Sequence, residues 1–257
     1  MQYIELYEAR VPVIGLGTWD LRGEICQRAV LSALNLGYRH IDTAQSYANE
    51  EEIGKALQSS PVPREEIFLT TKVWYTHLRY SEVIQALEES LRKLKTDYVD
   101  LYLIHWPSED VPLEETMSAM IKVKEEGKTR YIGVSNFDVP LLEKARQISP
   151  YPILTDQVEF HPYYSQRELL NYCQKNKVIL TAYSPLARRR LSDDLLLQEI
   201  GKKYGKTANQ VALRWLIQQE MVVAIPKAAS PEHQRENLDI FDFELTPEEM
   251  EKIFRLD

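Results

Sequence analysis

Cysteine and glycine are both scarce in this sequence. The two cysteines, Cys26 and Cys173, form no CxxC pair and have no histidine cluster near them, which excludes a disulfide framework. This usage is typical of a reducing compartment, so we expect a cytoplasmic protein. Glycine occurs 9 times in 257 residues, about half of the usual share of about 7%. Such low glycine content indicates short connections between elements rather than long flexible linkers.

Long hydrophobic runs are also missing. No stretch approaches 18 apolar residues, so we expect no membrane-spanning helix. The N-terminus has no basic start followed by an apolar stretch, and we therefore expect no signal peptide.

Positive charge is in deficit, with 31 basic against 39 acidic residues and a net charge of −8. A chain this acidic is a poor match for the phosphate backbone, and we expect no nucleic-acid partner. The hydrophobic fraction of 44% and the charged fraction of 27% are ordinary for a folded globular protein.

Several motifs of common enzyme classes are absent or incomplete. The segment Gly15-Leu16-Gly17 lacks the third glycine of a dinucleotide-binding GxGxxG turn, and no GxxxxGK[ST] phosphate loop occurs. Gly133-Val134-Ser135-Asn136-Phe137 lacks the closing glycine of a nucleophile elbow. No HExxH or comparable spacing occurs, so we expect no metal site.

A repeating pattern of short apolar runs and amphipathic segments is present instead. Most runs hold four to six residues rich in Val, Ile, Leu or Tyr, as buried parallel strands do. The runs begin near Ile14, His40, Ile67, Val99, Arg130, Ile153, Val178 and Val222. Helical spacing of apolar residues marks segments 25–34, 83–91, 165–175 and 193–204. The sequence thus predicts an α/β protein, a single (β/α)8 TIM barrel domain over residues 1–257. The rival, a doubly wound sheet, would usually carry a glycine fingerprint.

Polar residues recur where the predicted strands end. They are Asp42, Lys72, His105, Ser135, Asn136, Gln157, Glu159, Tyr183 and Lys227. In a parallel barrel these strand ends share one rim, where active sites of this fold lie. Each residue alone has a simpler explanation, since an Asp or Ser often caps the next helix and a Lys often reaches solvent. Their joint occurrence favours a functional site.

The sequence resembles the aldo-keto reductases over nearly its whole length. The resemblance rests on 36–44 (LGYRHIDTA) with Tyr47, 103–107 (LIHWP), 133–137 (GVSNF), 157–159 (QVE), 182–186 (AYSPL) and 225–227 (IPK), in this order. Within that family the chain is most similar to small bacterial reductases of the 2,5-diketogluconate and methylglyoxal type. The resemblance implies an oxidoreductase that reduces aldehydes and ketones, including dicarbonyls, keto-sugars and aromatic aldehydes, to alcohols.

The resemblance implies four catalytic residues, Asp42, Tyr47, Lys72 and His105. When hydride from a dihydronicotinamide attacks a carbonyl carbon, negative charge grows on the oxygen, and Tyr47 would protonate it. Free tyrosine has a pKa of about 10, and a Lys72 ammonium would lower it. Asp42 would keep Lys72 charged, and His105 would orient the carbonyl. General acid catalysis of this kind contributes about 10²–10⁴ in rate.

The resemblance also implies cofactor contacts. Ser135, Asn136 and Gln157 would hold the nicotinamide carboxamide, with Tyr183 stacked on the ring. Lys227 and Ser230 would bind the adenosine 2′-phosphate, and Glu236 and Asn237 the adenine. The other predicted cofactor residues are Gly17, Thr18, Trp19, Asp42, Ser184, Leu186, Ile225 and His233.

Two departures from the family pattern concern the choice of cofactor. Many members carry Ser and Arg where this chain has Ala228 and His233. Arginine is always charged, whereas histidine is mostly neutral at pH 7. We therefore expect NADPH as the cofactor, with NADH also possible. The run Arg188-Arg189-Arg190 has two open interpretations, a contact to the pyrophosphate or a solvated loop.

The predicted substrate site comprises Trp19, Tyr47, Trp74, His105 and Trp106. Many relatives continue into a long C-terminal loop over the substrate, whereas this sequence ends at Asp257 after a helical segment. We therefore expect an open pocket and broad scope for small-molecule carbonyl substrates. We also expect a monomer.

Two other functional classes stay open at this point. One is a cofactor-sensing binding protein, like the channel-associated β subunits built on this fold. The other is a phosphate-binding barrel isomerase, for which the set of Asp42, Tyr47, Lys72 and His105 would be a coincidence. Turnover of NADPH with a panel of aldehydes distinguishes all three classes.

Overall fold

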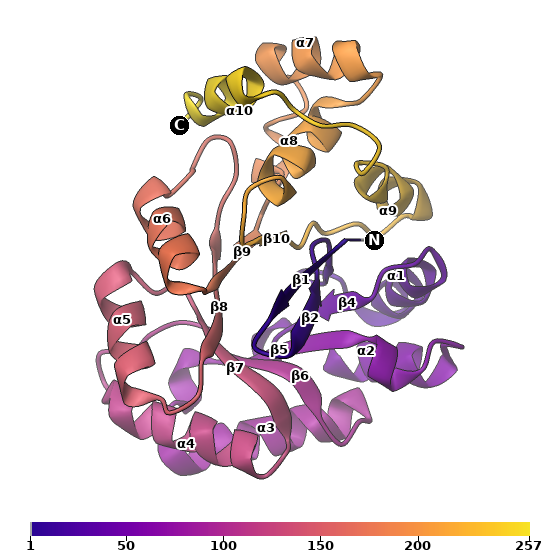
Figure 1. Cartoon of the computed structure of the whole chain (residues 1–257). Helices are drawn as coiled ribbons and strands as arrows, with labels where there is room; N and C mark the ends of the chain where they lie inside the picture. Colours follow the sequence, from indigo (N-terminus) through magenta and orange to yellow (C-terminus); the bar gives the residue numbers. More distant parts are fainter. Residues whose placement is uncertain (1) are drawn as a thin grey trace.

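A curved parallel sheet forms the centre of the computed structural model, which describes residues 2–257 (Figure 1). The sheet has eight strands in the order β10-β9-β8-β7-β6-β5-β4-β3. The strands are β3 (Leu16–Gly17), β4 (His40–Asp42), β5 (Phe68–Val73), β6 (Val99–Ile104), β7 (Thr129–Ser135), β8 (Ile153–Glu159), β9 (Ile179–Tyr183) and β10 (Val222–Ala224). A parallel bridge between Ile14 and Ala224 joins the two edges. The predicted eight-stranded α/β barrel is confirmed.

The strands form at the short apolar runs of the sequence. In the folded protein, both faces of these strands are covered and closed to solvent. All six residues of β5 and all six of β6 are buried, including Thr70, Thr71 and Lys72. Strands covered on both faces read as continuous apolar runs rather than as alternating patterns. The few polar residues within these runs are therefore the unusual ones, and they lie mainly toward the carboxyl ends.

Helices cover the outside of the sheet (Figure 1). They are α1 (Gly23–Asn35), α2 (Glu50–Ser59), α3 (Tyr80–Leu94), α4 (Leu113–Glu125), α5 (Val139–Ile148), α6 (Arg167–Asn176), α7 (Leu195–Tyr204), α8 (Ala208–Ile217), α9 (Pro231–Leu238) and α10 (Pro247–Phe254). The predicted helical segments correspond to α1, α3, α6 and α7. Local sequence fixes their ends: in α10, for example, the Thr246 hydroxyl accepts from the Glu249 amide, and the Glu249 carboxylate accepts from the Thr246 amide.

An antiparallel hairpin precedes the barrel and was not predicted from the sequence. It consists of β1 (Tyr3–Leu6) and β2 (Ala9–Pro12), with Tyr3 opposite Pro12. Ala9 and Val11 pack against Phe68, Leu101 and other strand residues in a second, smaller apolar cluster. Because Phe68 begins β5, this cluster lies toward the amino ends of the strands. The hairpin therefore covers that end and leaves the carboxyl ends as the accessible rim.

Two further features bear on the expected absence of membrane and metal sites. Within residues 2–257, no helix combines the length and apolar character needed to cross a bilayer. In the same part of the chain, no three side chains of His, Cys, Asp or Glu come together as ligands for a metal ion.

Candidate active site

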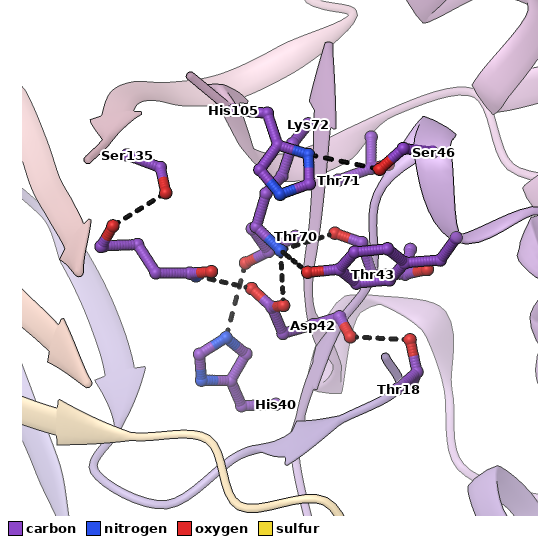
Figure 2. Close-up of polar contacts among 12 residues, drawn as sticks. Thr18, His40, Asp42, Thr43, Ser46, Thr70, Thr71, Lys72, His105 and Ser135 are labelled. Atoms are coloured by element: carbon purple, nitrogen blue, oxygen red, sulfur yellow. Dashed lines mark hydrogen bonds and ion pairs between the residues drawn. The ribbon is translucent and has the colours of Figure 1, made fainter. Parts of the chain in front are cut away.

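The carboxyl ends of neighbouring strands bring the predicted catalytic residues together (Figure 2). Asp42 is the last residue of β4, Lys72 lies at the end of β5, and His105 directly follows β6. Tyr47 belongs to a short 3-10 helix, η1 (Gln45–Tyr47), between β4 and α2. The four side chains come from separate segments of the sequence and are assembled by the parallel order of the strands.

Lys72 is the centre of this group. Its side chain is completely buried, and its Nζ donates to Asp42 Oδ1 at 2.6 Å, to the Thr43 carbonyl at 2.9 Å and to the Tyr47 hydroxyl at 3.2 Å. An ammonium group has three donors, and all three are used. The nitrogen is therefore held at one place, with the Tyr47 oxygen beside it.

Opposing effects set the protonation of Lys72 and Tyr47. Burial disfavours the charged form of Lys72, but the Asp42 carboxylate and Tyr47 outweigh burial, so the pKa of Lys72 is raised. Burial also raises the pKa of Tyr47, and the Lys72 ammonium lowers it only in part. From the sequence, the Lys72 ammonium alone predicts a lowered pKa for Tyr47; that net direction is wrong, because desolvation is the larger effect. Tyr47 is thus protonated at neutral pH.

His105 is neutral and held on several sides. Burial, followed by the nearby Lys72 charge, lowers the pKa of His105 to about 3. Its Nδ1 lies 3.4 Å from Ser46 Oγ (Figure 2). The rings of Tyr47 and Trp74 lie edge-on to the imidazole, with centroids at 5.6 and 5.0 Å. A neutral imidazole in this position has a hydrogen-bonding nitrogen available without carrying a charge.

The predicted nicotinamide residues form a linked set next to this group. Ser135 Oγ donates to the Gln157 carbonyl at 2.7 Å, and Asn136 Nδ2 donates to Ser135 Oγ and to the His105 carbonyl at 3.0 Å each. The Tyr183 hydroxyl donates to Asn136 Oδ1 at 2.9 Å. Gln157 in turn contacts Asp42, so the two predicted halves of the site are physically connected.

The cofactor residues predicted near β3, β9 and β10 differ in what they contact. The Gly17 amide donates to the Pro226 carbonyl and so helps to close the barrel, whereas the Ile225 amide donates to the Ala182 carbonyl and extends the pairing of β10 with β9. Thr18 is fully buried and its hydroxyl donates to the Asp42 carbonyl at 2.8 Å. Ser184 and Leu186 follow β9 and are half-buried.

The residues predicted to bind the adenosine end lie around the start of α9. Ser230 Oγ accepts from the His233 amide at 3.3 Å, so Ser230 is the N-cap of this helix. Glu236 accepts a hydrogen bond from the Thr207 hydroxyl at 2.7 Å. Asn237 is buried. The structure thus brings Ser230 and His233 together at the start of α9, while Asn237 lies within the fold.

The three predicted tryptophans occupy different places on the rim. Trp74 contacts His105, whereas Trp106 is 42% and Trp19 54% exposed. Trp19 lies beneath two cations, with Arg188 at 5.7 Å and Lys227 at 5.8 Å from its ring centroid. The structure therefore places Trp74 nearest the catalytic group and Trp19 on the side of the predicted phosphate contacts.

Several residues that support the site were missed by the sequence argument. The Thr43 carbonyl and Ser46 contact Lys72 and His105 directly. The Asn49 amide donates to the carbonyls of Thr18 and Leu21, and its oxygen accepts from Thr43 Oγ1. Each of these residues lies within a few positions of Asp42 or Tyr47, and this proximity was the available signal.

Comparisons with known proteins identify the class to which this site belongs. The model of the aldo/keto reductase family matches residues 13–257. The chain belongs to this family and is an NAD(P)H-dependent oxidoreductase that reduces carbonyl compounds.

Individual relatives are similar over almost their full length. A glyoxal reductase of Bacillus subtilis is 44% identical over 95% of this chain and 88% of the relative. The methylglyoxal reductase DkgB of Escherichia coli O157:H7 is 41% identical over 96% of this chain and 93% of the relative. A solved structure provisionally named 2,5-diketo-D-gluconic acid reductase B superposes with a TM-score of 0.98 at 46% identity, covering 100% of this chain and 91% of that one. A thermostable aldo-keto reductase crystallised with the inhibitor epalrestat gives 0.95 at 46% identity and full coverage of both chains.

Proposed function

We propose that this protein reduces aldehydes and ketones with NADPH and that Tyr47 is the proton donor. The observation that carries this proposal is the buried Lys72 ammonium, which contacts both the Asp42 carboxylate and the Tyr47 hydroxyl. A lysine that is completely buried costs free energy unless its charge is used or paired. Here it is paired on one side and directed at a titratable hydroxyl on the other.

The residues present fit a nicotinamide cofactor. A carboxamide needs both donors and acceptors, and Ser135, Asn136 and Gln157 supply both from adjacent strand ends. Tyr183 is half-buried and tied to Asn136, which gives a fixed aromatic face beside these groups. When bound, the dihydronicotinamide supplies a hydride to the carbonyl carbon.

The proton would come from Tyr47. Because burial raises its pKa, the hydroxyl is protonated at neutral pH and can serve as an acid. As negative charge develops on the substrate oxygen, the proton moves from Tyr47 to that oxygen, and the phenolate left behind lies 3.2 Å from Lys72 Nζ. The ammonium therefore stabilises the charge that the transfer creates. Asp42 would hold Lys72 in place and keep it protonated.

His105 would orient the carbonyl. Since its pKa is lowered to about 3, the imidazole is neutral at every pH where the protein is expected to act. A neutral N–H can donate to the substrate oxygen without competing with Tyr47 as an acid. Trp74, which contacts the imidazole ring, would limit its movement and form part of the substrate wall.

The preference for NADPH would come from Lys227 and Ser230. Lys227 is exposed and lies 3.8 Å from Asp20, a weak pairing that leaves the ammonium able to bind a phosphate. Ser230 lies at the N-terminus of α9, where backbone N–H groups favour an anion. His233 in the first turn stands where many family members carry an arginine, so the hold on the phosphate is weaker and NADH would also be accepted.

The proposed substrates are small dicarbonyls, keto-sugars and aromatic aldehydes. Similarity to proteins named glyoxal, methylglyoxal and 2,5-diketo-D-gluconic acid reductases supports this range. Residues from β4 to β10 contribute to the site, which supports one catalytic domain over residues 1–257. We further propose a cytoplasmic monomer; both cysteines are free and buried, in keeping with a reducing compartment.

The decisive experiment is a steady-state screen of these carbonyls with NADPH and with NADH. Turnover is measured as the loss of cofactor absorbance. The proposal expects turnover with both cofactors and the higher kcat/KM with NADPH. A cofactor-sensing binding protein would bind NADPH with negligible turnover, and an isomerase would act without the cofactor. Either result would contradict the proposal.

A further inference from the structure

The three consecutive arginines after β9 do not act as one group. Arg188 lies over the Trp19 ring, on the side of the predicted phosphate contacts. Arg190 instead lines a pocket formed by the ends of β7 and β8 and by the segment that follows β8. From the sequence, a pyrophosphate contact and a solvated loop were both open for the whole run. Arg190 is exposed, as a solvated loop implies, but its side chain also borders this pocket.

This pocket, of about 530 Å³, continues from the candidate active site. Asn136 and Tyr183 belong to both, and Trp106 directly follows the catalytic His105. Much of the remaining wall is aromatic. The other lining residues that bear on its chemistry are Phe137, Asp138, Glu159, His161 and Tyr164. A ligand held at the catalytic group could therefore extend past Trp106 into this pocket.

Arg190 supplies the guanidinium of this pocket, at its exposed edge. Its Nε donates to the Ala187 carbonyl at 3.1 Å, which fixes the side chain against its own loop. Within residues 2–257 it forms no ion pair, so the two terminal nitrogens keep their donors free. A guanidinium held this way presents a planar fork that matches a carboxylate.

The acidic groups of the pocket, by contrast, are already engaged. Asp138 caps α5 by accepting from the Leu141 amide at 2.9 Å. Glu159 Oε1 lies 3.2 Å from His161 Nε2. Since both carboxylates lie at the ends of β7 and β8, a ligand's negative charge is repelled there and favoured near Arg190 on the opposite loop.

One buried polar atom in the wall also lacks a partner. His161 is 1% exposed, and its Nδ1 has no hydrogen-bond partner among residues 2–257. Buried polar atoms are normally satisfied, so an unmet one beside a pocket indicates a place where a bound group completes the hydrogen bonds. Together with the free guanidinium, it marks this pocket as built for a polar ligand.

From this arrangement we infer that the pocket is a subsite for the carboxylate end of an oxo acid whose carbonyl group lies at the catalytic residues. The inference rests on the proposed function and names a part of its substrate range. Arg190 binds the carboxylate, and the side chains of Trp106, Phe137 and Tyr164 pack along the chain that joins it to the carbonyl. Arg190 is thus a residue that determines specificity for charged over neutral carbonyl substrates.

A graded series of ω-oxo acids with four to ten carbons, each paired with its methyl ester, tests the subsite. For each pair the ratio of kcat/KM for the acid to that for the ester is measured. At the chain length that spans the two sites, we expect a ratio of about tenfold or more, from a charge-assisted hydrogen bond. Arg190→Ala should abolish this ratio, mainly through KM of the acid, and Arg190→Lys should restore it in part.

Arg189→Ala is the matched control, because it removes the same charge from the same exposed loop but does not line the pocket. It should retain the ratio. The proposed carboxylate subsite is contradicted if Arg189→Ala lowers the ratio as much as Arg190→Ala does. It is also contradicted if the ratio is near one at every chain length. Failure to reduce any ester would instead contradict the proposed function itself, since the esters do not depend on Arg190.

Discussion

The side chain of Gln157 holds Asp42 from across the barrel: its Nε2 donates to Asp42 Oδ2 at 2.7 Å, although the two residues are 115 positions apart. The other carboxylate oxygen of Asp42 accepts from Lys72 at 2.6 Å. One carboxylate therefore links a residue predicted to bind the nicotinamide with the lysine next to the proton donor. Gln157 acts as a positioning residue for the catalytic group as well as a proposed cofactor contact.

This relationship predicts that Gln157→Leu lowers kcat at saturating NADPH, by about tenfold, in addition to weakening cofactor binding. The loss arises because Asp42 Oδ2 is left buried without its donor, which costs about 1–3 kcal/mol. Dissociation constants from fluorescence titration and kcat from steady-state kinetics separate the two effects. A variant that changes only the NADPH dissociation constant would show that Gln157 does not position Asp42.

Tyr47→Phe tests the proton donor. Removing the hydroxyl should lower kcat by about 10²–10⁴, because it removes the protonated group that contacts Lys72. NADPH affinity should stay nearly constant. Tyr183→Phe is a suitable comparison, since it also removes one tyrosine hydroxyl but keeps the ring proposed to stack on the nicotinamide, and it should lose far less activity. Turnover of Tyr47→Phe near the wild-type rate would disprove the assignment.

Lys72→Met tests the buried ion pair through stability. Removing one partner leaves Asp42 charged and buried, and such a loss typically costs about 3–5 kcal/mol. The double variant Asp42→Asn with Lys72→Met should recover much of that free energy of unfolding, because no unpaired charge remains. Both variants should be inactive. Denaturant unfolding gives the comparison, and equal stability of the single and double variants would contradict a strong pairing.

Most of the fold could be predicted from the sequence because parallel strands buried on both faces leave a clear pattern. The run 99–104 (VDLYLI) and the amphipathic segment that precedes it are examples. The hairpin at residues 3–12 was missed, because its strands are short and only partly buried, with Arg10 and Glu5 on exposed positions. Such strands have no strong periodicity, and their role depends on which barrel end they cover.

The site was predictable as a set of residues but not as a set of contacts. Residue types at strand ends, together with the family resemblance, gave Asp42, Tyr47, Lys72 and His105. The bond from Gln157 to Asp42 follows from barrel curvature, which no sequence spacing encodes. The raised pKa of Tyr47 likewise depends on the depth of burial, a property of the assembled barrel rather than of the motif.

His233→Arg should tighten NADPH binding by about tenfold and leave NADH binding nearly unchanged. The residue is exposed in the first turn of α9, next to Ser230, where a guanidinium could reach a 2′-phosphate. Titration of both cofactors measures the effect. His233→Gln serves as the control for loss of the imidazole alone. Equal gains for NADPH and NADH would show that this helix end does not bind the phosphate.

Asp156 provides a prediction about stability and pH. It lies fully buried on β8; one carboxyl oxygen accepts from the Phe137 amide at 3.5 Å, and the other has no partner within residues 2–257. Burial, with a smaller contribution from Asp138, raises the pKa of Asp156 well above its ordinary value. The folded protein thus keeps a proton that the unfolded chain releases.

Stability should therefore fall as pH rises above the pKa of the unfolded Asp156, near 4. Between that value and the raised folded pKa, the loss is about 1.4 kcal/mol per pH unit. Asp156→Asn keeps the shape without an ionisable proton, so its gain in Tm over the wild type should be larger at pH 8 than at pH 5. Asp138→Asn removes only the smaller, neighbouring-charge contribution to the pKa of Asp156, so its increase with pH should be smaller than that of Asp156→Asn. A Tm difference between Asp156→Asn and wild type that stays constant from pH 5 to pH 8 would mean that Asp156 does not hold a proton in the folded barrel.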